Sequence, residues 1–237
     1  MSGAWTVERV GSVPSTMDIA KEKARAGAPD RWAVVAEEMT AGRGSHDRRW
    51  HAPPGGLYLS FVLRDLPDPH LATLALGNAV ADTLEVAGAE PRLKWVNDVW
   101  VDGRKVAGIL VEAESTGSKL DFLVAGIGVN VNGPAARFPT PLDQQAATLE
   151  DILGCDSCIP DLETLLLHNV DKWVAKLKDR QDGEVLEAFR ARDALKGKTV
   201  RVGDLEGTAA GIDGQGRLLV QTAKGQKAVQ SGTVTLL

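Results

Sequence analysis

Four short blocks of this sequence combine glycines, cations and amides in a pattern suited to holding an anion. They are residues 42–50 (GRGSHDRRW), 94–98 (KWVND), 105–110 (KVAGIL) and 126–132 (GIGVNVN). Arg43 and Arg48 carry planar sets of donors that match phosphate or carboxylate. Gly42 and Gly44 allow close backbone approach and positive φ angles. Each block alone has an ordinary structural alternative, such as a solvated basic turn. Together they predict a site for a nucleotide and a carboxylate.

The second and third blocks are expected to meet in a hairpin, because a turn at Asp102-Gly103 separates them. This brings Lys94 close to Lys105. Strand alternation would place Lys94 and Val96 on one face and Trp95 and Asn97 on the other. Because Asn97 and Asp98 lie beside two lysines, we predict that they contact a magnesium–phosphate complex. The alternative is that both are ordinary turn residues.

The glycines of the last two blocks interrupt apolar strands. Gly108, Gly126 and Gly128 weaken packing there, but they let a ligand lie against the backbone. Asn130 and Asn132 fall on one face of the expected strand, where their amides could contact a base or ribose or simply face solvent. The GIG segment lacks the third glycine and the following helix of a dinucleotide fingerprint, so a Rossmann fold is excluded.

The remaining sequence predicts the elements that position these blocks. Apolar patterns predict strands at 5–13, 32–38, 57–63, 92–95, 99–101, 106–113 and 121–131, and helices at 16–27, 71–87, 148–153, 162–177 and 183–195. Residues 40–56 read as a long loop, which is usually functional in a compact domain. Five closely spaced strands after Gly197 predict a small SH3-like β-barrel. We therefore expect an α+β fold, with a mixed central sheet flanked by helices in residues 1–192 and the barrel in 193–237.

Composition limits the function classes. The chain has 237 residues, 43% of them hydrophobic, and a net charge of −5 from 27 basic and 32 acidic residues, which argues against non-specific nucleic-acid binding. Neither a membrane span nor a secretory signal is visible, so a cytoplasmic protein is expected. The two cysteines, Cys155 and Cys158, have C-x-x-C spacing. No second pair or histidine pair accompanies them, which favours incidental thiols over a redox or zinc site.

The four blocks, in this order, resemble those of the biotin–protein ligases from about Val13 to Arg192, and the C-terminal strands also fit that family. The resemblance implies a catalytic domain like that of class II synthetases. It also implies two steps with ATP and Mg²⁺. Biotin carboxylate attacks the α-phosphate to give biotinyl-5′-AMP and pyrophosphate, and a lysine of a biotin carboxyl carrier domain then displaces AMP.

The resemblance also implies roles for particular residues. Lys105 would span the carboxylate and the α-phosphate, with Arg43 and Arg48 neutralising charge, and Asp98 would lie near the acceptor lysine. The further contacts that we predict are, for biotin, Ser15, Thr16, Met39, Gly42, Arg43, Lys105, Gly108, Gly126 and Gly128, and for ATP, Arg43, Arg48, Trp50, Lys94, Asn97, Asn130 and Asn132. The sequence identifies no metal ligands.

Some positions depart from the family pattern. Ser45 and Asp47 replace an arginine and a glycine of the loop, so we expect the loop to hold biotinyl-5′-AMP less tightly and the intermediate to dissociate more readily. Met39 replaces a common glutamine. Only a short segment precedes Ser15, so we expect a monofunctional ligase that binds neither DNA nor membrane. A homodimer is possible for this family. Two alternatives stay open: a lipoate or octanoate ligase or transferase of the same fold, and a non-catalytic biotin sensor.

Overall fold

A seven-stranded mixed sheet forms the centre of the protein. The structure is a computed structural model, which describes residues 4–45, 48–67, 69–117 and 119–237. Strands β1 and β2 pair in parallel and the other neighbours pair antiparallel. The order across the sheet is β1 (Thr6–Val13), β2 (Trp32–Met39), β3 (Leu57–Leu63), β7 (Lys119–Val129), β6 (Arg104–Thr116), β5 (Asp98–Val101) and β4 (Arg92–Lys94).

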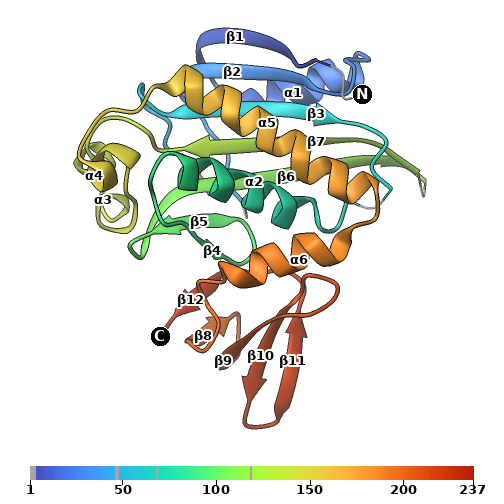
Figure 1. Cartoon of the computed structure of the whole chain (residues 1–237), viewed down its shortest axis with the longest axis vertical. Helices are drawn as coiled ribbons and strands as arrows, with labels where there is room; N and C mark the ends of the chain where they lie inside the picture. Colours follow the sequence, from blue (N-terminus) through green and yellow to red (C-terminus); the bar gives the residue numbers. More distant parts are fainter. Residues whose placement is uncertain (1–3, 46–47, 68, 118) are drawn as a thin grey trace.

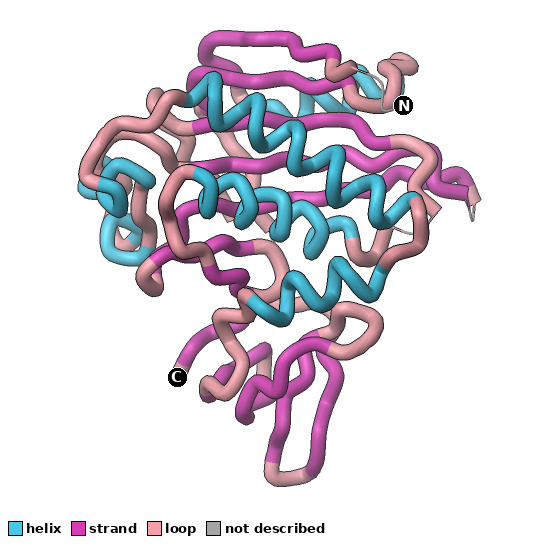
Figure 2. Tube along the Cα trace, in the orientation of Figure 1, coloured by secondary structure: helices cyan, strands magenta, loops and turns pink. Residues whose placement is uncertain are grey.

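Helices cover both faces of this sheet (Figures 1 and 2). Helix α1 (Thr16–Arg25) packs on one face against β3, β7 and β2. On the other face α2 (Ala72–Val86) lies between α5 (Ile159–Lys178) and α6 (Asp182–Ala191) (Figure 1). Because β3 is covered on both faces, its sequence LYLSFVL is buried throughout. Short helices η1 (Ala135–Arg137), α3 (Leu142–Gln145) and α4 (Leu149–Leu153) complete one end.

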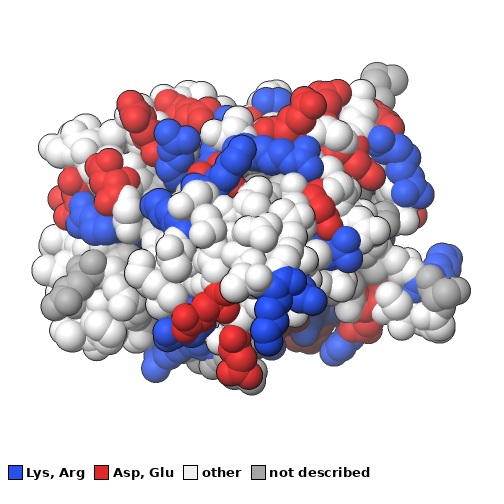
Figure 3. Space-filling view, turned by 90° about the horizontal axis from the view of Figure 1, so that it is seen from below, with Lys and Arg blue, Asp and Glu red and all other residues white. Residues whose placement is uncertain are grey.

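The C-terminal residues form a five-stranded antiparallel sheet below α6 (Figure 1). Its hydrogen-bonded order is β11 (Gly225–Val229), β10 (Leu218–Thr222), β9 (Leu205–Ile212), β8 (Thr199–Val202) and β12 (Val234–Leu236). Figure 3, viewed from this end, shows acidic and basic side chains interspersed, without a field of one sign on that face.

The C-terminal sheet is attached directly to the KWVND segment. The indole Nε1 of Trp95 donates to the carbonyl of Gly216 over 2.9 Å. Gly216 has φ +74°, and a Cβ there would lie 2.7 Å from Leu71, the N-cap of α2, and 2.8 Å from Leu74 in its first turn. Glycine is therefore required at this turn for two reasons, the left-handed backbone and the contact with α2.

The fold class expected from the sequence and the order of the predicted elements are confirmed, with η1 and α3 in addition, and several strand limits differ by one to three residues. Two of the differing strand ends bear on the site. Strand β7 ends at Val129, and residues 95–97 form a turn after β4. Strand alternation therefore does not apply to Trp95 and Asn97, or to Asn130 and Asn132. No helix among the described residues is long and apolar enough to cross a membrane.

Candidate functional site

The largest group of predicted site residues surrounds one cavity of about 170 Å³ on the sheet face that α1 covers. Its walls come from the start of α1, the end of β2, the 40–56 loop and the central strands β3, β7 and β6. Twelve of the predicted residues line it: Ser15, Thr16, Met39, Arg43, Arg48, Trp50, Asn97, Lys105, Gly108, Gly126, Gly128 and Asn130.

The three strand glycines make a trough in the sheet. Gly108 pairs with Gly128 across β6 and β7, and Asp98 pairs with Gly108 from β5. Gly126 pairs with Ser60 of β3. Since paired residues share a face of the sheet, the trough runs across the central strands toward the carboxylate of Asp98.

The ring of Trp50 lies in this trough. A Cβ on Gly128 would be 2.6 Å from Trp50 Cε2, and one on Gly108 would be 2.9 Å from Cζ3. Trp50 Nε1 is buried without a hydrogen-bond partner among the described residues. The glycines thus provide space for an indole, whose Nε1 lies 2.7 Å from the position of a Gly128 Cβ. The ammonium of Lys105 lies 5.2 Å from the ring centroid.

The predicted basic loop folds back on itself. The amide of Gly44 donates to the carbonyl of Arg48 over 2.7 Å, and that of Trp50 to Gly42 over 2.8 Å. A Cβ on Gly42 would lie 2.6 Å from the Trp50 carbonyl. The expectation of positive φ at Gly42 and Gly44 is wrong, because neither is among the glycines with positive φ. Gly42 is needed for close approach between the two arms of the loop, and it does not line the cavity.

The two predicted loop arginines, Arg43 and Arg48, are held by partners within the protein. Arg43 Nη2 donates to the two oxygens of Glu112 over 2.9 and 3.0 Å, and its Nη1 lies 3.2 Å from Asp18. Arg48 donates to the Ser45 carbonyl over 3.1 Å and to the Ser45 hydroxyl over 2.8 Å. Asp47, one of the departures from the family pattern, lies outside the described residues.

Lys105 and Asp98 form an ion pair of 2.5 Å at the edge of the cavity. Their side chains are 29% and 17% exposed, so the pair is partly shielded from water and remains accessible to a ligand. Sequence reasoning gave these residues separate roles. The structure brings them together, because β5 and β6 are adjacent strands of one hairpin.

A second cavity of about 160 Å³ adjoins the first and shares Ser45, Arg48, Asn97, Ile109 and Leu110 with it. Lys94 and Asp98 line this second cavity together with Thr233, the residue before β12. Burial lowers the pKa of Lys94, while nearby Asp98 opposes that shift and Lys105 and Arg48 add to it. Lys94 Nζ lies 4.6 Å from the Trp100 ring centroid.

The three predicted asparagines have different surroundings. Asn97 donates to the Ile109 carbonyl over 2.9 Å and lines both cavities. Asn130 is 3% exposed, and its Oδ1 has no partner within the described part of the chain. Asn132 lies outside both cavities, because its amide makes two 2.9 Å bonds with the Ser157 main chain. We therefore leave Asn132 out of the site.

Sequence reasoning missed Ser60, which is fully buried on β3 and lines the cavity next to Thr16. A serine in an otherwise apolar strand was the available signal. His51, Met17 and Phe138 also line the cavity without having been predicted.

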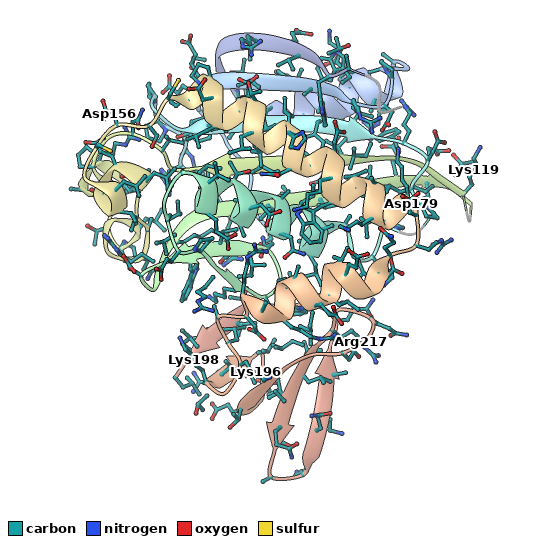
Figure 4. The ribbon with its side chains drawn as sticks, viewed as in Figure 1. Lys119, Asp156, Asp179, Lys196, Lys198 and Arg217 are labelled. Carbon is teal, nitrogen blue, oxygen red and sulfur yellow. The ribbon has the colours of Figure 1, made fainter. Side chains whose placement is uncertain are left out.

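Among the described residues, no cluster of three or more His, Cys, Asp or Glu side chains could hold a metal ion. Cys155 and Cys158 are exposed free thiols on either side of Asp156, which Figure 4 places near α4.

Comparison with known families gives two matches that cover most of the chain. Residues 10–130 match the biotin/lipoate A/B protein ligase family, and residues 197–237 match the biotin protein ligase C terminal domain. The first match includes all four sequence blocks except Val131 and Asn132.

Individual relatives agree with this result. The chain is 33% identical to the biotin–[acetyl-CoA-carboxylase] ligase of Mycobacterium tuberculosis, covering 100% of this chain and 91% of that one. It is 32% identical to the bifunctional ligase/repressor BirA of Bacillus subtilis, covering 94% and 71%. The biotin protein ligase of Aquifex aeolicus in complex with biotin and ATP has a TM-score of 0.86 and 29% identity, covering 98% of each chain.

Proposed function

The chain belongs to the biotin protein ligase family, and we propose that it attaches biotin to a lysine of a carrier domain, using ATP and a biotinyl-5′-AMP intermediate. The observation that carries this proposal is the glycine trough under Trp50, with the Lys105–Asp98 pair at its edge. The strand glycines and the Trp50 ring together line an apolar surface for a ring and chain, and Lys105 supplies a cation where a carboxylate and a phosphate must meet.

Lys105 is the residue best placed to bring these two anions together. A carboxylate and a triphosphate repel each other, so a fixed cation between them stabilises the charge that develops in the transition state. Lys105 already holds one carboxylate, that of Asp98. Arrival of a substrate anion would share or replace that contact and release Asp98. The freed carboxylate could then orient the amine of the acceptor lysine, or accept a proton from it.

The adenine nucleotide would lie along Trp50 and Asn130. The Trp50 indole N–H and the Asn130 Oδ1 are a donor and an acceptor without partners in the described part of the chain. Leaving such buried groups unpaired costs roughly 1–3 kcal/mol each, and a base or ribose would pair them. Arg48 and Lys94 would bind the phosphates from the second cavity.

Mg²⁺ fits this site as a companion of the triphosphate. Magnesium in phosphoryl-transfer sites is commonly held by one or two carboxylates together with substrate phosphates. Asp98 and Asn97 supply oxygen ligands of that kind, and the described residues add no further cluster. When bound, Mg²⁺ would neutralise phosphate charge and polarise the α-phosphate.

The partner we propose is a biotin carboxyl carrier protein or domain of a biotin-dependent carboxylase. We further propose that the protein acts in the cytoplasm without binding DNA or membrane, that it can form a homodimer, and that its domains divide between residues 192 and 193. The 32% identical BirA of Bacillus subtilis is described as a bifunctional ligase/repressor, so a DNA-binding assay is a necessary check.

The decisive test incubates the protein with MgATP, labelled biotin and a purified carrier domain. Lys105→Ala is the test variant, and Lys119→Ala is the matched control because Lys119 lies at the far tip of the β6–β7 hairpin (Figure 4). We expect wild type and control to label the carrier, and Lys105→Ala to lose at least about 100-fold in rate. Transfer of lipoate or octanoate instead would refute the substrate, and biotin binding without adenylate would indicate a sensor.

A further inference from the structure

The chain that follows α6 pairs in parallel with the edge of the central sheet. The amide of Leu93 on β4 donates to the Arg192 carbonyl over 2.7 Å, and the amide of Ala194 donates to the Leu93 carbonyl over 2.9 Å. Both main-chain groups of Leu93 are therefore bonded to residues 192–194, which we call the linker. Leu93 is 1% exposed and directly precedes Lys94, so the position of the linker determines where the Lys94 side chain begins.

The side chain of Arg192 attaches the linker to the end of α2. Its Nε and Nη2 donate to the two carboxylate oxygens of Glu85 over 2.8 and 2.7 Å, and Nη2 also donates to Asp82 Oδ1 over 2.7 Å. The side chains of Arg192 and Asp82 are 18% and 13% exposed. Bidentate bonds between a guanidinium and a carboxylate fix direction as well as distance. Arg192 therefore holds the linker at one place relative to α2.

Asp82 has further donors that do not depend on Arg192. Its other oxygen, Oδ2, accepts hydrogen bonds from Lys172 Nζ and Trp173 Nε1 of α5, both over 2.8 Å. Asp82 would keep these two donors if the Arg192 side chain were removed, and the half-exposed Glu85 would then be hydrated. Removing Arg192 should consequently release the linker without leaving a buried charge unpaired, which would be far more costly to the fold.

A second attachment lies on the other side of Lys94. The Trp95 indole donates to the Gly216 carbonyl. The turn that carries Gly216 is in turn bonded to α6, because Arg190 Nη2 donates to the Asp213 carbonyl over 3.0 Å. Helix α6 lies between α2 and the C-terminal sheet (Figure 1). Both neighbours of Lys94 are thus fixed from the end of this helix, while Lys94 itself lines the second cavity.

We propose that Arg192 is a positioning residue for Lys94. Its bonds to Asp82 and Glu85 hold the linker, the linker holds Leu93, and the ammonium of Lys94 is thereby kept in place in the second cavity. The inference rests on the function proposed above, in which Lys94 binds the phosphates of ATP. Arg192 lines neither of the two cavities and does not contact the nucleotide in this scheme. Its effect on ATP should therefore depend on Lys94.

The test measures KM for ATP and KM for biotin by pyrophosphate release. Arg192→Ala should raise KM for ATP by about three- to tenfold and leave KM for biotin within about twofold, because the first cavity is not bonded to the linker. Glu85→Gln weakens the same anchor and should raise KM for ATP by about two- to threefold. Arg25→Ala is the matched control, because Arg25 makes a similar bidentate contact with Glu114, and it should change neither constant.

A double variant separates positioning of Lys94 from a general structural effect. Lys94→Ala should raise KM for ATP by about ten- to 100-fold, since a charge-assisted bond to phosphate is lost. Adding Arg192→Ala to Lys94→Ala should raise it little further, because both changes act on the same contact.

The pH dependence of KM for ATP gives an independent measurement. Burial lowers the pKa of Lys94, and the charged groups that act on it are Asp98, Lys105 and Arg48. Arg192→Ala removes none of these groups. A released linker would expose Lys94 to water, which raises its pKa, so the rise in KM for ATP should move to higher pH in this variant.

An unchanged KM for ATP in Arg192→Ala, an equal rise in KM for biotin, or additivity with Lys94→Ala would each overturn the proposal. If Arg192→Ala does not fold, Glu85→Gln decides by the same criteria, because it leaves the contacts of Asp82 intact. An unchanged KM for ATP in Lys94→Ala would refute the nucleotide contact proposed for Lys94, and the inference with it. A wild-type protein that forms no biotinyl-AMP would instead refute the proposed function.

Discussion

Replacing Gly128 by alanine tests whether the glycine trough exists to accommodate Trp50. The added methyl would lie 2.6 Å from Cε2, 2.7 Å from Nε1 and 2.8 Å from Cζ2 of the indole. Ordinary contact begins near 3.4 Å, so the ring must retreat by about 0.8 Å. Because the Trp50 amide is bonded to Gly42, the movement would be passed to the loop that carries Arg43 and Arg48.

The expected cost has two parts. Overpacking of this kind destabilises a fold by about 1–3 kcal/mol, and misplacing catalytic groups by about 1 Å can reduce turnover by about 100-fold. We therefore expect kcat/KM for ATP to fall by about ten- to 100-fold, with a lower melting temperature. Steady-state pyrophosphate release and thermal denaturation measure the two parts. Gly11→Ala is the control, because a Cβ there meets nothing within 4 Å.

The smaller ring of a Trp50→Phe substitution should recover part of the loss when combined with Gly128→Ala. A Gly128→Ala enzyme with activity within about twofold of wild type would refute the reasoning, since the clash would then have been absorbed without moving the loop. The same holds if Trp50→Phe and Gly128→Ala combine additively, because a relieved clash requires coupling between the two positions.

Three further predictions concern the charged groups of the site. Because burial lowers the pKa of Lys94, its positive charge is lost at a lower pH than that of an ordinary lysine. KM for ATP should therefore rise with increasing pH before the ordinary lysine pKa of about 10.4 is reached, and Lys94→Arg should move this rise to higher pH. Glu112→Gln removes the carboxylate that accepts two hydrogen bonds from Arg43. Because this ion pair holds the 40–56 loop against β6, trypsin should cleave the loop of the variant up to about fivefold faster. An unchanged cleavage rate would show that the ion pair does not restrain the loop. Ser45→Arg should slow the dissociation of biotinyl-AMP, which is measured by filtration of the preformed complex. If the variant releases biotinyl-AMP as fast as the wild type or faster, Ser45 is not the cause of weak retention of the intermediate.

Much of the fold could be predicted because the apolar patterns match the burial. Strand β3 agrees with its predicted limits at both ends, and α2 differs by one residue at each end. Helix α5 begins at Ile159, three residues before the prediction, because Pro160 occupies the first turn, where its missing N–H costs nothing. The KWVND and KVAGIL blocks meet through the Asp102-Gly103 turn, whose φ angles are both positive, as expected of a tight hairpin.

The site was less predictable where strands end or where distant strands meet. Asn130 and Asn132 were expected on one face, but β7 ends at Val129, and the two amides bond to Ala147 and Ser157 instead. The contact of Ser60 with Thr16 joins residues 44 positions apart. It depends on α1 packing against β3, and local patterns carry no information about that pairing.

The bond between Trp95 and Gly216 has a consequence for engineering. A C-terminal segment taken from another protein could be exchanged for this one only if it brought a glycine at the same turn and a carbonyl facing the indole. A segment with a side chain at this position would clash with Leu71 and Leu74. The resulting displacement of the carbonyl would disturb its hydrogen bond with Trp95 and so the turn between Lys94 and Asp98. Chimeras, truncations and fusions at the C-terminal side should therefore be designed with residues 95 and 216 as a matched pair.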